Sequence, residues 1–204
     1  IKVKPVTVYL NQYGFALVAP ADVDNGSFDN CKISTRILSQ SVFTCGNAGN
    51  NSVVFTLTDG SGNTSTATAT VLVKDSTAPG NKTRNPVAYL DKNGFAILSS
   101  FDIDNGSSDN CGITKTTLSK DRFTCSDLGK NSVVYSTVDA AGNQSKSNIE
   151  VTVLDSIKPV MRATNRTVYL DSTGTFDLDW SYFDVGSSDN CKITKRTLSQ
   201  YHFT

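Results

Sequence analysis

The chain has 204 residues, of which 38% are hydrophobic and 19% charged, and its 19 basic and 19 acidic side chains cancel to a net charge of zero. This balance excludes the basic surface typical of a nucleic-acid binder, and no run of about 18 apolar residues exists to span a bilayer. The acidic residues are 18 Asp and one Glu, while Ser and Thr supply 48 residues. Because Thr and Val favour strands whereas Asp, Asn, Ser and Gly favour turns, the composition predicts an all-β chain.

Short strands with turn residues between them are predicted along the first 75 residues. A polar loop over 20–30 separates the first two strands from the rest, and a hairpin loop over 59–63 joins the last two. This density of short strands is typical of a small immunoglobulin-like β-sandwich. The predicted strands cover residues 6–10, 15–18, 32–38, 42–45, 53–58 and 64–74.

The same pattern returns after a shift of 80 residues. Val8-Tyr9-Leu10 recurs as Ala88-Tyr89-Leu90, and Asp29-Asn30-Cys31 recurs as Asp109-Asn110-Cys111. Self-similarity at a fixed period is the signature of tandem modules. We therefore expect tandem immunoglobulin-like β-sandwich domains of about 80 residues in an elongated array, contacting their neighbours. The predicted repeats are 1–75, cut at its N-terminal side, 76–155, which is complete, and 156–204, cut at its C-terminal side.

Five cysteines recur with the repeat. Each of the first two repeats holds a pair separated by 14 residues, and two Cys per repeat with a single His, His202, cannot form a four-ligand zinc site. We expect disulfides within repeats, which indicate an extracellular or cell-surface location. The predicted bridges are Cys31–Cys45 and Cys111–Cys125, with Cys191 left from a severed pair.

The motifs of the second repeat resemble those of a known family. They are Tyr-Leu-Asp-x-x-Gly from Tyr89, Asp-x-Asp-Asn-Gly-Ser-Ser-Asp-Asn-Cys from Asp102, and Val-Asp-x-x-Gly-Asn from Val138. The combination resembles the hyalin-repeat-like, immunoglobulin-like modules of secreted Bacteroidetes surface proteins, among them the giant gliding adhesins of the SprB type. The resemblance implies a non-catalytic stalk or display module exported by the type IX secretion system.

Two departures from that family are visible. Many such repeats carry a further Cys pair that links the first and last strands, and this chain has none there. The third repeat places Tyr182 and Val185 where the second has Asp102 and Asn105. The third repeat therefore lacks two of the polar side chains that a site shared by the three repeats would use.

Acidic loops are the strongest candidate for chemistry. In such a sandwich, the long loop and the last hairpin lie where the linker from the preceding repeat arrives, so we expect Asp75 to meet the carboxylates of the second repeat. Like charges at close range repel unless a cation neutralises them, and oxygen ligands suit Ca²⁺. This logic resembles the calcium-stiffened junctions of cadherin-like arrays. The candidate ligands are Asp75, Asp102, Asp104, Asp109 and Asp139, their counterparts Asp155, Asp184 and Asp189, and, in the first repeat, Asp22, Asp24, Asp29 and Asp59.

Other interpretations stay open. The same Asp, Asn and Gly residues also serve as metal-free turns, and no catalytic motif is present, so an enzyme is not expected. The recurring aromatic residues are expected in the core, whereas Trp180 is a candidate for an exposed binding aromatic; the expected core residues are Tyr9, Tyr89, Tyr169, Phe43, Phe123 and Phe203. Alternatives to the adhesin are a carbohydrate-binding or spacer array of a secreted polysaccharide-degrading enzyme, or a polymerising subunit. The expected partners are neighbouring repeats and, through the parent protein, an extracellular surface or glycan. Binding to nucleic acid and insertion into a membrane are not expected. The candidate O-glycosylation sites are Ser76, Ser156 and Ser172.

Overall fold

The computed structural model describes all 204 residues and divides into two compact units. The first unit comprises residues 1–84, 104–117 and 135–147, and the second comprises 85–103, 118–134 and 148–204. The chain is nearly all β, as predicted, with only single helical turns between strands. None of its helices has the length and hydrophobicity needed to cross a membrane.

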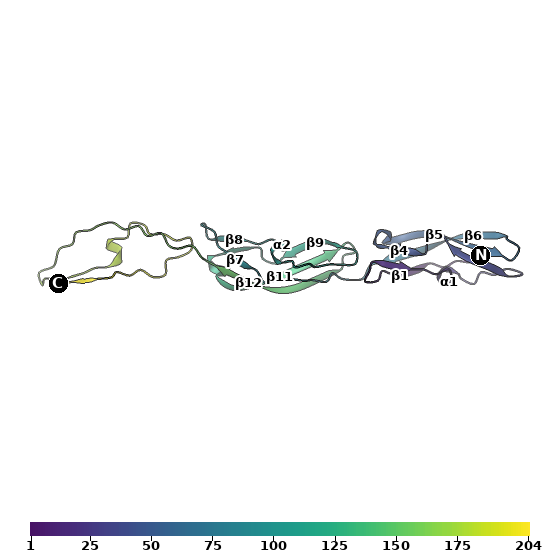
Figure 1. The fold of residues 1–204 in the computed structure, drawn as a ribbon, viewed down its shortest axis with the longest axis horizontal. Coiled ribbons are helices and arrows are strands. Elements are labelled where there is room, and N and C mark those ends of the chain that lie inside the picture. The colour runs from purple at the N-terminus through teal and green to yellow at the C-terminus, as the bar shows by residue number, and fades with distance from the viewer. The chain divides into compact units, whose positions relative to one another are not determined.

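The first repeat is a sandwich of a four-stranded and a two-stranded sheet. The larger sheet has the order β1-β6-β5-β3, and the smaller pairs β2 with β4. In Figure 1 the two long strands β5 and β6 run beside each other in this repeat. The strands are β1 Val6–Tyr9, β2 Phe15–Leu17, β3 Ile33–Leu38, β4 Val42–Thr44, β5 Gly49–Asp59 and β6 Thr64–Lys74.

The outer strand β1 pairs in parallel with β6, the last strand of the same repeat, so that Val6 stands opposite Val71. The strands β5 and β6 form a long antiparallel hairpin that closes at Asp59, where the main-chain N–H donates to Asn63 O over 3.0 Å. The Asp59 carboxylate also accepts from the N–H groups of Ser61 and Asn63 at 2.8 Å. The predicted hairpin loop over 59–63 is therefore confirmed.

Two single turns of helix interrupt the strands. The first, α1 (Pro20–Val23), lies inside the predicted loop, where Pro20 supplies a fixed φ at the first helical turn. The Asp22 carboxylate accepts from Ala19 N–H at 2.7 Å, and Val23 is fully buried. The second, η1 (Cys45–Asn47), follows β4 directly.

The core lies between the two sheets. Phe43 of β4 and Phe55 of β5 are both fully buried and belong to one cluster with Val53, Val71 and Val73. The alternation of apolar side chains along each strand places one face of each sheet in this core. Phe43 and its counterpart Phe123 were predicted to be core residues, and both are buried.

The recurring tyrosines are not core residues. Tyr9 is 58% exposed, Tyr89 59% and Tyr169 83%, so the prediction that they pack in the core is wrong. Tyr9 ends β1, which pairs only with β6 at the sheet edge, and the strand alternation there turns Tyr9 outward while Val8 packs against the core. The exposed rings are a surface feature of each repeat.

The second repeat has the same strand order, β7-β12-β11-β9 with β8 paired to β10. In the third repeat the structure has one short pair of strands, in which Phe176 pairs with Phe203 and Asp177 with His202, together with two isolated bridges and one helical turn. The elements are β7 Val87–Tyr89, β8 Phe95–Ile97, α2 Ser100–Ile103, β9 Ile113–Leu118, β10 Arg122–Thr124, η2 Cys125–Asp127, β11 Gly129–Asp139, β12 Gln144–Leu154, β13 Phe176–Asp177, η3 Trp180–Tyr182 and β14 His202–Phe203.

The segment from β3 to β4 decides where the cysteines lie. Ile33 pairs with Asp59, at the end of the repeat where the β5–β6 hairpin closes, whereas Thr44 pairs with Phe15 near the opposite end. This segment passes from the larger sheet to the smaller one and never turns back. Cys31, just before β3, and Cys45, just after β4, therefore lie at opposite ends of the first repeat.

Candidate functional site

The disulfides join neighbouring repeats, and the predicted pairing within repeats is wrong. Cys45 is bonded to Cys111 and Cys125 to Cys191, each over a sequence separation of 66 and a Cα–Cα distance of 5.4 Å. Cys31 is a free, exposed thiol. The predicted Cys31–Cys45 bridge fails because a disulfide needs Cα atoms within about 7 Å, and these two residues lie at opposite ends of one repeat.

Each disulfide belongs to a joint that also contains a glycine turn. Gly14 has φ +78°, and a Cβ built on it would stand 2.7 Å from Asn110 O and 2.9 Å from the Cys45 sulfur. Gly94 has φ +77°, and its Cβ would stand 2.8 Å from Asn190 O. Only glycine allows both this backbone conformation and this close approach.

An asparagine side chain fastens the same joint. The Asn110 Nδ2 group donates to Asn11 O at 3.2 Å and to the Asp75 carboxylate at 3.1 Å. The contacts recur in the second unit, where Asn190 Nδ2 donates at 3.1 Å to both Asp91 O and the Asp155 carboxylate. The joint is therefore one repeated arrangement of turn, amide and disulfide.

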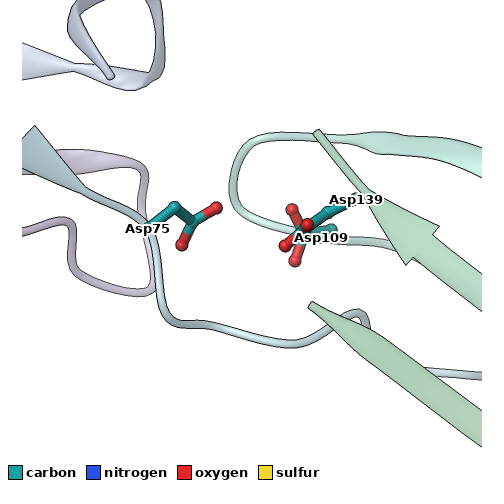
Figure 2. Close-up of side chains that lie close together, drawn as sticks. All are labelled: Asp75, Asp109 and Asp139. Atoms are coloured by element: carbon teal, nitrogen blue, oxygen red, sulfur yellow. The ribbon is translucent and has the colours of Figure 1, made fainter. Parts of the chain in front are cut away.

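Three carboxylates gather beside the first joint, with one oxygen from each of Asp75, Asp109 and Asp139 within 4.8 Å of the others. Figure 2 shows the Asp75 side chain directed at the other two. Asp75 directly follows β6, Asp109 precedes β9 in its loop, and Asp139 is the last residue of β11. These three residues, one each from the linker, the loop and the hairpin, thus lie close together, as predicted from the sequence.

The hydrogen bonds of this cluster leave several oxygens unpartnered. The Asp139 side chain is buried, and its two oxygens accept from the Asn143 N–H and Nδ2 groups, each at 2.8 Å. Asn143 Nδ2 also donates to Asp75 O at 3.3 Å, which attaches the hairpin to the linker. In contrast, Asp75 Oδ2, Asp109 Oδ2 and Asn110 Oδ1 are buried without a hydrogen-bond partner. Buried oxygens of this kind are costly unless something binds them.

Two predicted ligands of the same repeat do not join the cluster. The Asp102 carboxylate accepts from Ser99 N–H at 2.7 Å and caps α2, as Asp22 caps α1. Asp104 accepts from Ser107 N–H at 2.9 Å. The side-chain and backbone hydrogen bonds from Ser107 lower the pKa of Asp104 although partial burial raises it. Both residues hold the long loop in shape.

The acidic residues of the first repeat have similar turn roles. Asp24 accepts from Ser27 N–H at 2.8 Å and forms an ion pair with Arg36 at 3.2 Å. Burial raises the pKa of Asp24, but the hydrogen bonds from Ser27 and Arg36 together lower it by more than burial raises it, so the net shift is downward. Asp29 accepts from the N–H groups of Cys31 and Lys32. Asp59 closes the hairpin, and the bonds from Asn63 lower its pKa.

The second joint contains two of its three predicted acids. Asp155 accepts from Asn190, and Asp189 accepts from Cys191 N–H at 3.0 Å. Asp184 instead forms an ion pair with Arg196 at 3.0 Å, repeating the pair of Asp24 with Arg36. The counterparts Asp24, Asp104 and Asp184 are thus loop anchors in all three repeats.

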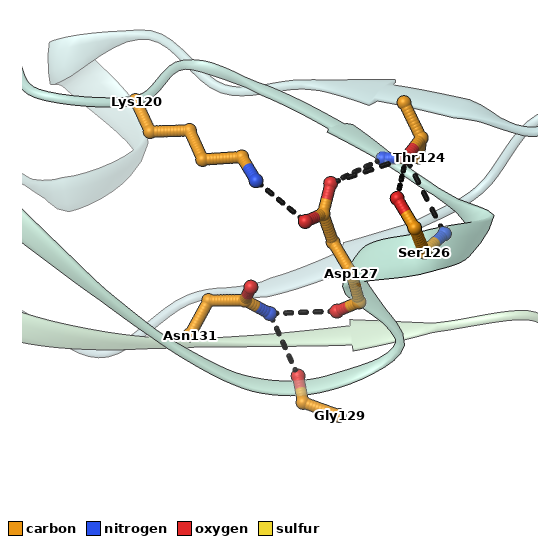
Figure 3. A network of polar contacts seen from close by, with 6 residues as sticks. All are labelled: Lys120, Thr124, Ser126, Asp127, Gly129 and Asn131. Carbon is orange, nitrogen blue, oxygen red and sulfur yellow. Dashed lines mark hydrogen bonds and ion pairs between the residues drawn. The ribbon is translucent and has the colours of Figure 1, made fainter.

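A polar network specific to the second repeat lies beside η2, and Figure 3 shows it. The Lys120 ammonium contacts the Asp127 carboxylate at 2.5 Å, and the other Asp127 oxygen accepts from Thr124 N–H at 2.9 Å. The hydrogen bond and charge of Lys120, then the Thr124 N–H, lower the pKa of Asp127. In the first repeat Asn47 makes the same bond to Thr44 N–H without an ion pair.

Sequence reasoning missed three components of the joint: the pairing of Cys45 with Cys111, Asn110 and Gly14. A signal was present for each, because Asn110 and Gly14 recur at the 80-residue period in all three repeats. The separation of 66 residues between two bonded cysteines equals the 80-residue repeat length minus the 14 residues that separate the two cysteines of one repeat. The candidate glycosylation sites Ser76, Ser156 and Ser172 are exposed, and their modification stays a prediction.

No family model matches the chain, and no curated protein matches it. Among solved structures it is similar to the protocadherin GammaB4 extracellular domain, at 13% identity and a TM-score of 0.35 over 80% of this chain and 33% of that one. It is also similar to human mucin-like protocadherin EC1-2, at 11% identity and TM-score 0.38 over 76% and 97% of the two chains. The fibronectin(III)-like modules of Clostridium thermocellum CbhA match at 12% identity and TM-score 0.30, over 75% and 91%. Likeness this low carries no inference about function.

Proposed function

We propose that the chain is a non-catalytic segment of a secreted, cell-surface adhesin of the hyalin-repeat-like kind. Its role is to carry an adhesive or gliding surface at a distance from the cell through a row of β-sandwich repeats. The disulfides that join one repeat to the next support this proposal, because they connect modules rather than enclose a reaction site. They also fit an oxidising, extracellular compartment.

We further propose that Ca²⁺ binds Asp75, Asp109 and Asp139. The observation that carries this is the gathering of three carboxylates within 4.8 Å, two of which have a buried oxygen without a hydrogen-bond partner. Ionised carboxylates this close repel each other, and a divalent cation would neutralise them. Carboxylate and amide oxygens are the ligands that Ca²⁺ prefers, and Asn110 Oδ1 offers a further free oxygen. When bound, the ion would hold linker, loop and hairpin together.

Calorimetric titration of the full chain with Ca²⁺ tests this site. We expect binding by the unchanged chain and its loss in Asp109→Asn and Asp75→Asn. Asp104→Asn is the matched control, because Asp104 belongs to the same loop but is used in a turn. Small-angle scattering with Ca²⁺ or EGTA then reports whether the ion stiffens the array. Absence of binding heat in the unchanged chain would contradict the calcium site and would leave the joint to its disulfide and to the hydrogen bonds of Asn110 and Asn143.

A carbohydrate-binding array is the second candidate, and the exposed aromatic rings favour it. Tyr89 is 59% exposed and lines a shallow surface pocket with Phe95 and Ile97. Rings of this kind can stack on sugars, although the Arg196 guanidinium already covers the Trp180 ring, at 4.5 Å from its centroid. Retention of the chain on immobilised polysaccharides, lost in Tyr89→Ala, would support this alternative over a plain stalk.

A further inference from the structure

One face of the first repeat has the same types of residue as the face of the second repeat that forms the first joint. In the first repeat this face is uncovered. In the second repeat the corresponding face is bonded to Cys45 and lies against the Gly14 turn and Asp75. At the first repeat the Cys31 thiol is exposed and free. The residues of this open face are Asp29, Asn30, Cys31, Asp59 and Asn63, and those of the covered face are Asp109, Asn110, Cys111, Asp139 and Asn143.

The structure contains two examples of how such a face is used. Cys111 and Cys191, the counterparts of Cys31, are each bonded to a cysteine 66 residues earlier. The asparagine before each of them donates to the turn and to the linker aspartate of the preceding repeat. The same residue types in the same positions therefore form the same joint twice within this chain.

An apolar side chain adds to the open face. Phe28 is 79% exposed and lies beside Ile1, Asp29 and Asp59 around a small surface hollow. The second repeat has Ser108 at this position, whose backbone pairs with Gly80 of the linker. Phe28 can make the same backbone pairing and would lose its exposed apolar surface when covered.

We propose that the open face binds a further module of the same kind, tied to it by a disulfide from Cys31. This module presents a cysteine at the position of Cys45, a glycine turn like that of Gly14 and an aspartate at the position of Asp75, and its linker leads into Ile1. The inference rests on the proposed role of the chain as a repeat array, and it extends the covalent connection to one more joint.

The bond forms by oxidation of two thiols. The Cys31 sulfur and the module's sulfur become one disulfide, and their two electrons and two protons pass to a disulfide oxidant such as oxidised glutathione, which becomes two thiols. A second copy of this chain is not the occupant, because its Cys45 and Cys125 are already bonded. Their sulfurs also lie against Asn110 O and Asn190 O at 3.4 and 3.5 Å.

The test is a chain in which a copy of residues 1–80 is fused directly before Ile1 of the full sequence. After refolding with reduced and oxidised glutathione, free thiols are alkylated and the unreduced protein is digested for mass spectrometry. We expect a new disulfide between the cysteine at position 45 of the added copy and the original Cys31. The only alkylated cysteine should then be the one at position 31 of the added copy.

The bonds Cys45–Cys111 and Cys125–Cys191 of the original sequence serve as internal controls. Replacing the added copy's cysteine at position 45 by Ser should return the original Cys31 to full alkylation. The inference is overturned if both control bonds form while the original Cys31 stays free, or if the original Cys31 pairs instead with the cysteine at position 31 of the added copy. Either result would leave the proposed role of the two existing joints intact.

Discussion

Gly14 lies so close to Asn110 that a Cβ on it would stand 2.7 Å from the Asn110 carbonyl oxygen. Gly14 belongs to the turn after β1, and Asn110 to the loop that precedes β9, so the contact joins two neighbouring repeats. The first repeat can approach the loop this closely only because Gly14 carries no side chain. Adding one methyl group at Gly14 therefore tests how closely the two repeats approach each other at this joint.

We expect Gly14→Ala to lower the stability of the joint by about 2 to 4 kcal/mol, from the strain of a positive φ and from displacement of Asn110. Gly26→Ala is the matched control, because Gly26 has φ +79° but its Cβ would meet nothing within 4 Å. Urea unfolding of both variants separates the two effects. Equal losses in the two would mean that the contact with Asn110 contributes nothing.

Cys111→Ser should release Cys45 and destabilise the chain by about 4 kcal/mol, the value that chain entropy assigns to a loop of this length. Cys31→Ser should leave the unfolding midpoint unchanged because Cys31 is exposed and unbonded. Urea unfolding and non-reducing peptide mapping check both expectations. Recovery of a Cys31–Cys45 peptide from the unchanged chain would contradict the structure.

Asp127→Asn should make stability less dependent on pH under acid conditions. The ion pair with Lys120 lowers the pKa of Asp127 below its ordinary value of 3.8, so its contribution is present above that pH and is lost as pH falls through the lowered pKa. The gap in melting temperature between the two proteins should therefore close below pH 3.8. Asn can keep the bond to Thr124 N–H, as Asn47 does in the first repeat.

Thermal melts between pH 2 and pH 7, a range of about five units that spans the titration of Asp, measure this effect. Asp121→Asn removes the same charge from the preceding turn and serves as the control. A gap that stays constant across the range would show that the Lys120–Asp127 pair does not contribute to the stability of the second repeat.

Tyr135→Phe should protect the chain against alkali. Tyr135 is buried, and burial raises its pKa above 10.0; the Ser107 hydrogen bond opposes this rise, and the Asp104 charge adds to it. Stability from the neutral phenol is present below pH 10 and is lost as pH rises through the raised pKa. The variant, which copies Phe55 of the first repeat, should keep its stability where the unchanged chain loses it.

This comparison is best made in a Cys31→Ser background, because a free thiolate at high pH can attack the disulfides. Near neutral pH the Tyr135→Phe change should cost no more than about 1 kcal/mol, the net value of one hydrogen bond. Melting temperatures that fall equally with alkali in both proteins would contradict the assigned environment of Tyr135.

The strands could be predicted closely because local alternation decides them. Phe43 and Phe123 are the middle residues of β4 and β10 and are buried, and the hairpin at Asp59 has turn residues that allow little else. Tyr9 was misplaced because an aromatic residue in a strand is equally compatible with either face at a sheet edge. The sequence pattern alone could not show which face of β1 packs against the core and which face is exposed to solvent.

The joint could be predicted only in part. Asp75, Asp109 and Asp139 were expected together because linker, loop and hairpin meet at one end of any such sandwich. The cysteine pairing depended on the path of residues 32–44, which could either turn back within one sheet or cross from one sheet to the other. Both paths are compatible with the same alternation of apolar and polar residues, so the sequence could not decide between them. Asp104 was assigned as a ligand because a turn aspartate and a metal ligand look alike until Ser107 is seen to donate to it.

The disulfide pattern also limits how far the chain can lengthen under load. Cys45 and Cys191 are 146 residues apart, but tension between them passes through both bridges, so the residues inside each closed loop carry none of it. Only the 14 residues from Cys111 to Cys125 remain outside the loops. At roughly 3.5 Å per residue this segment extends to about 50 Å, against about 500 Å for the unbridged chain. A pulled array of this kind would therefore stay short even after its sheets had come apart.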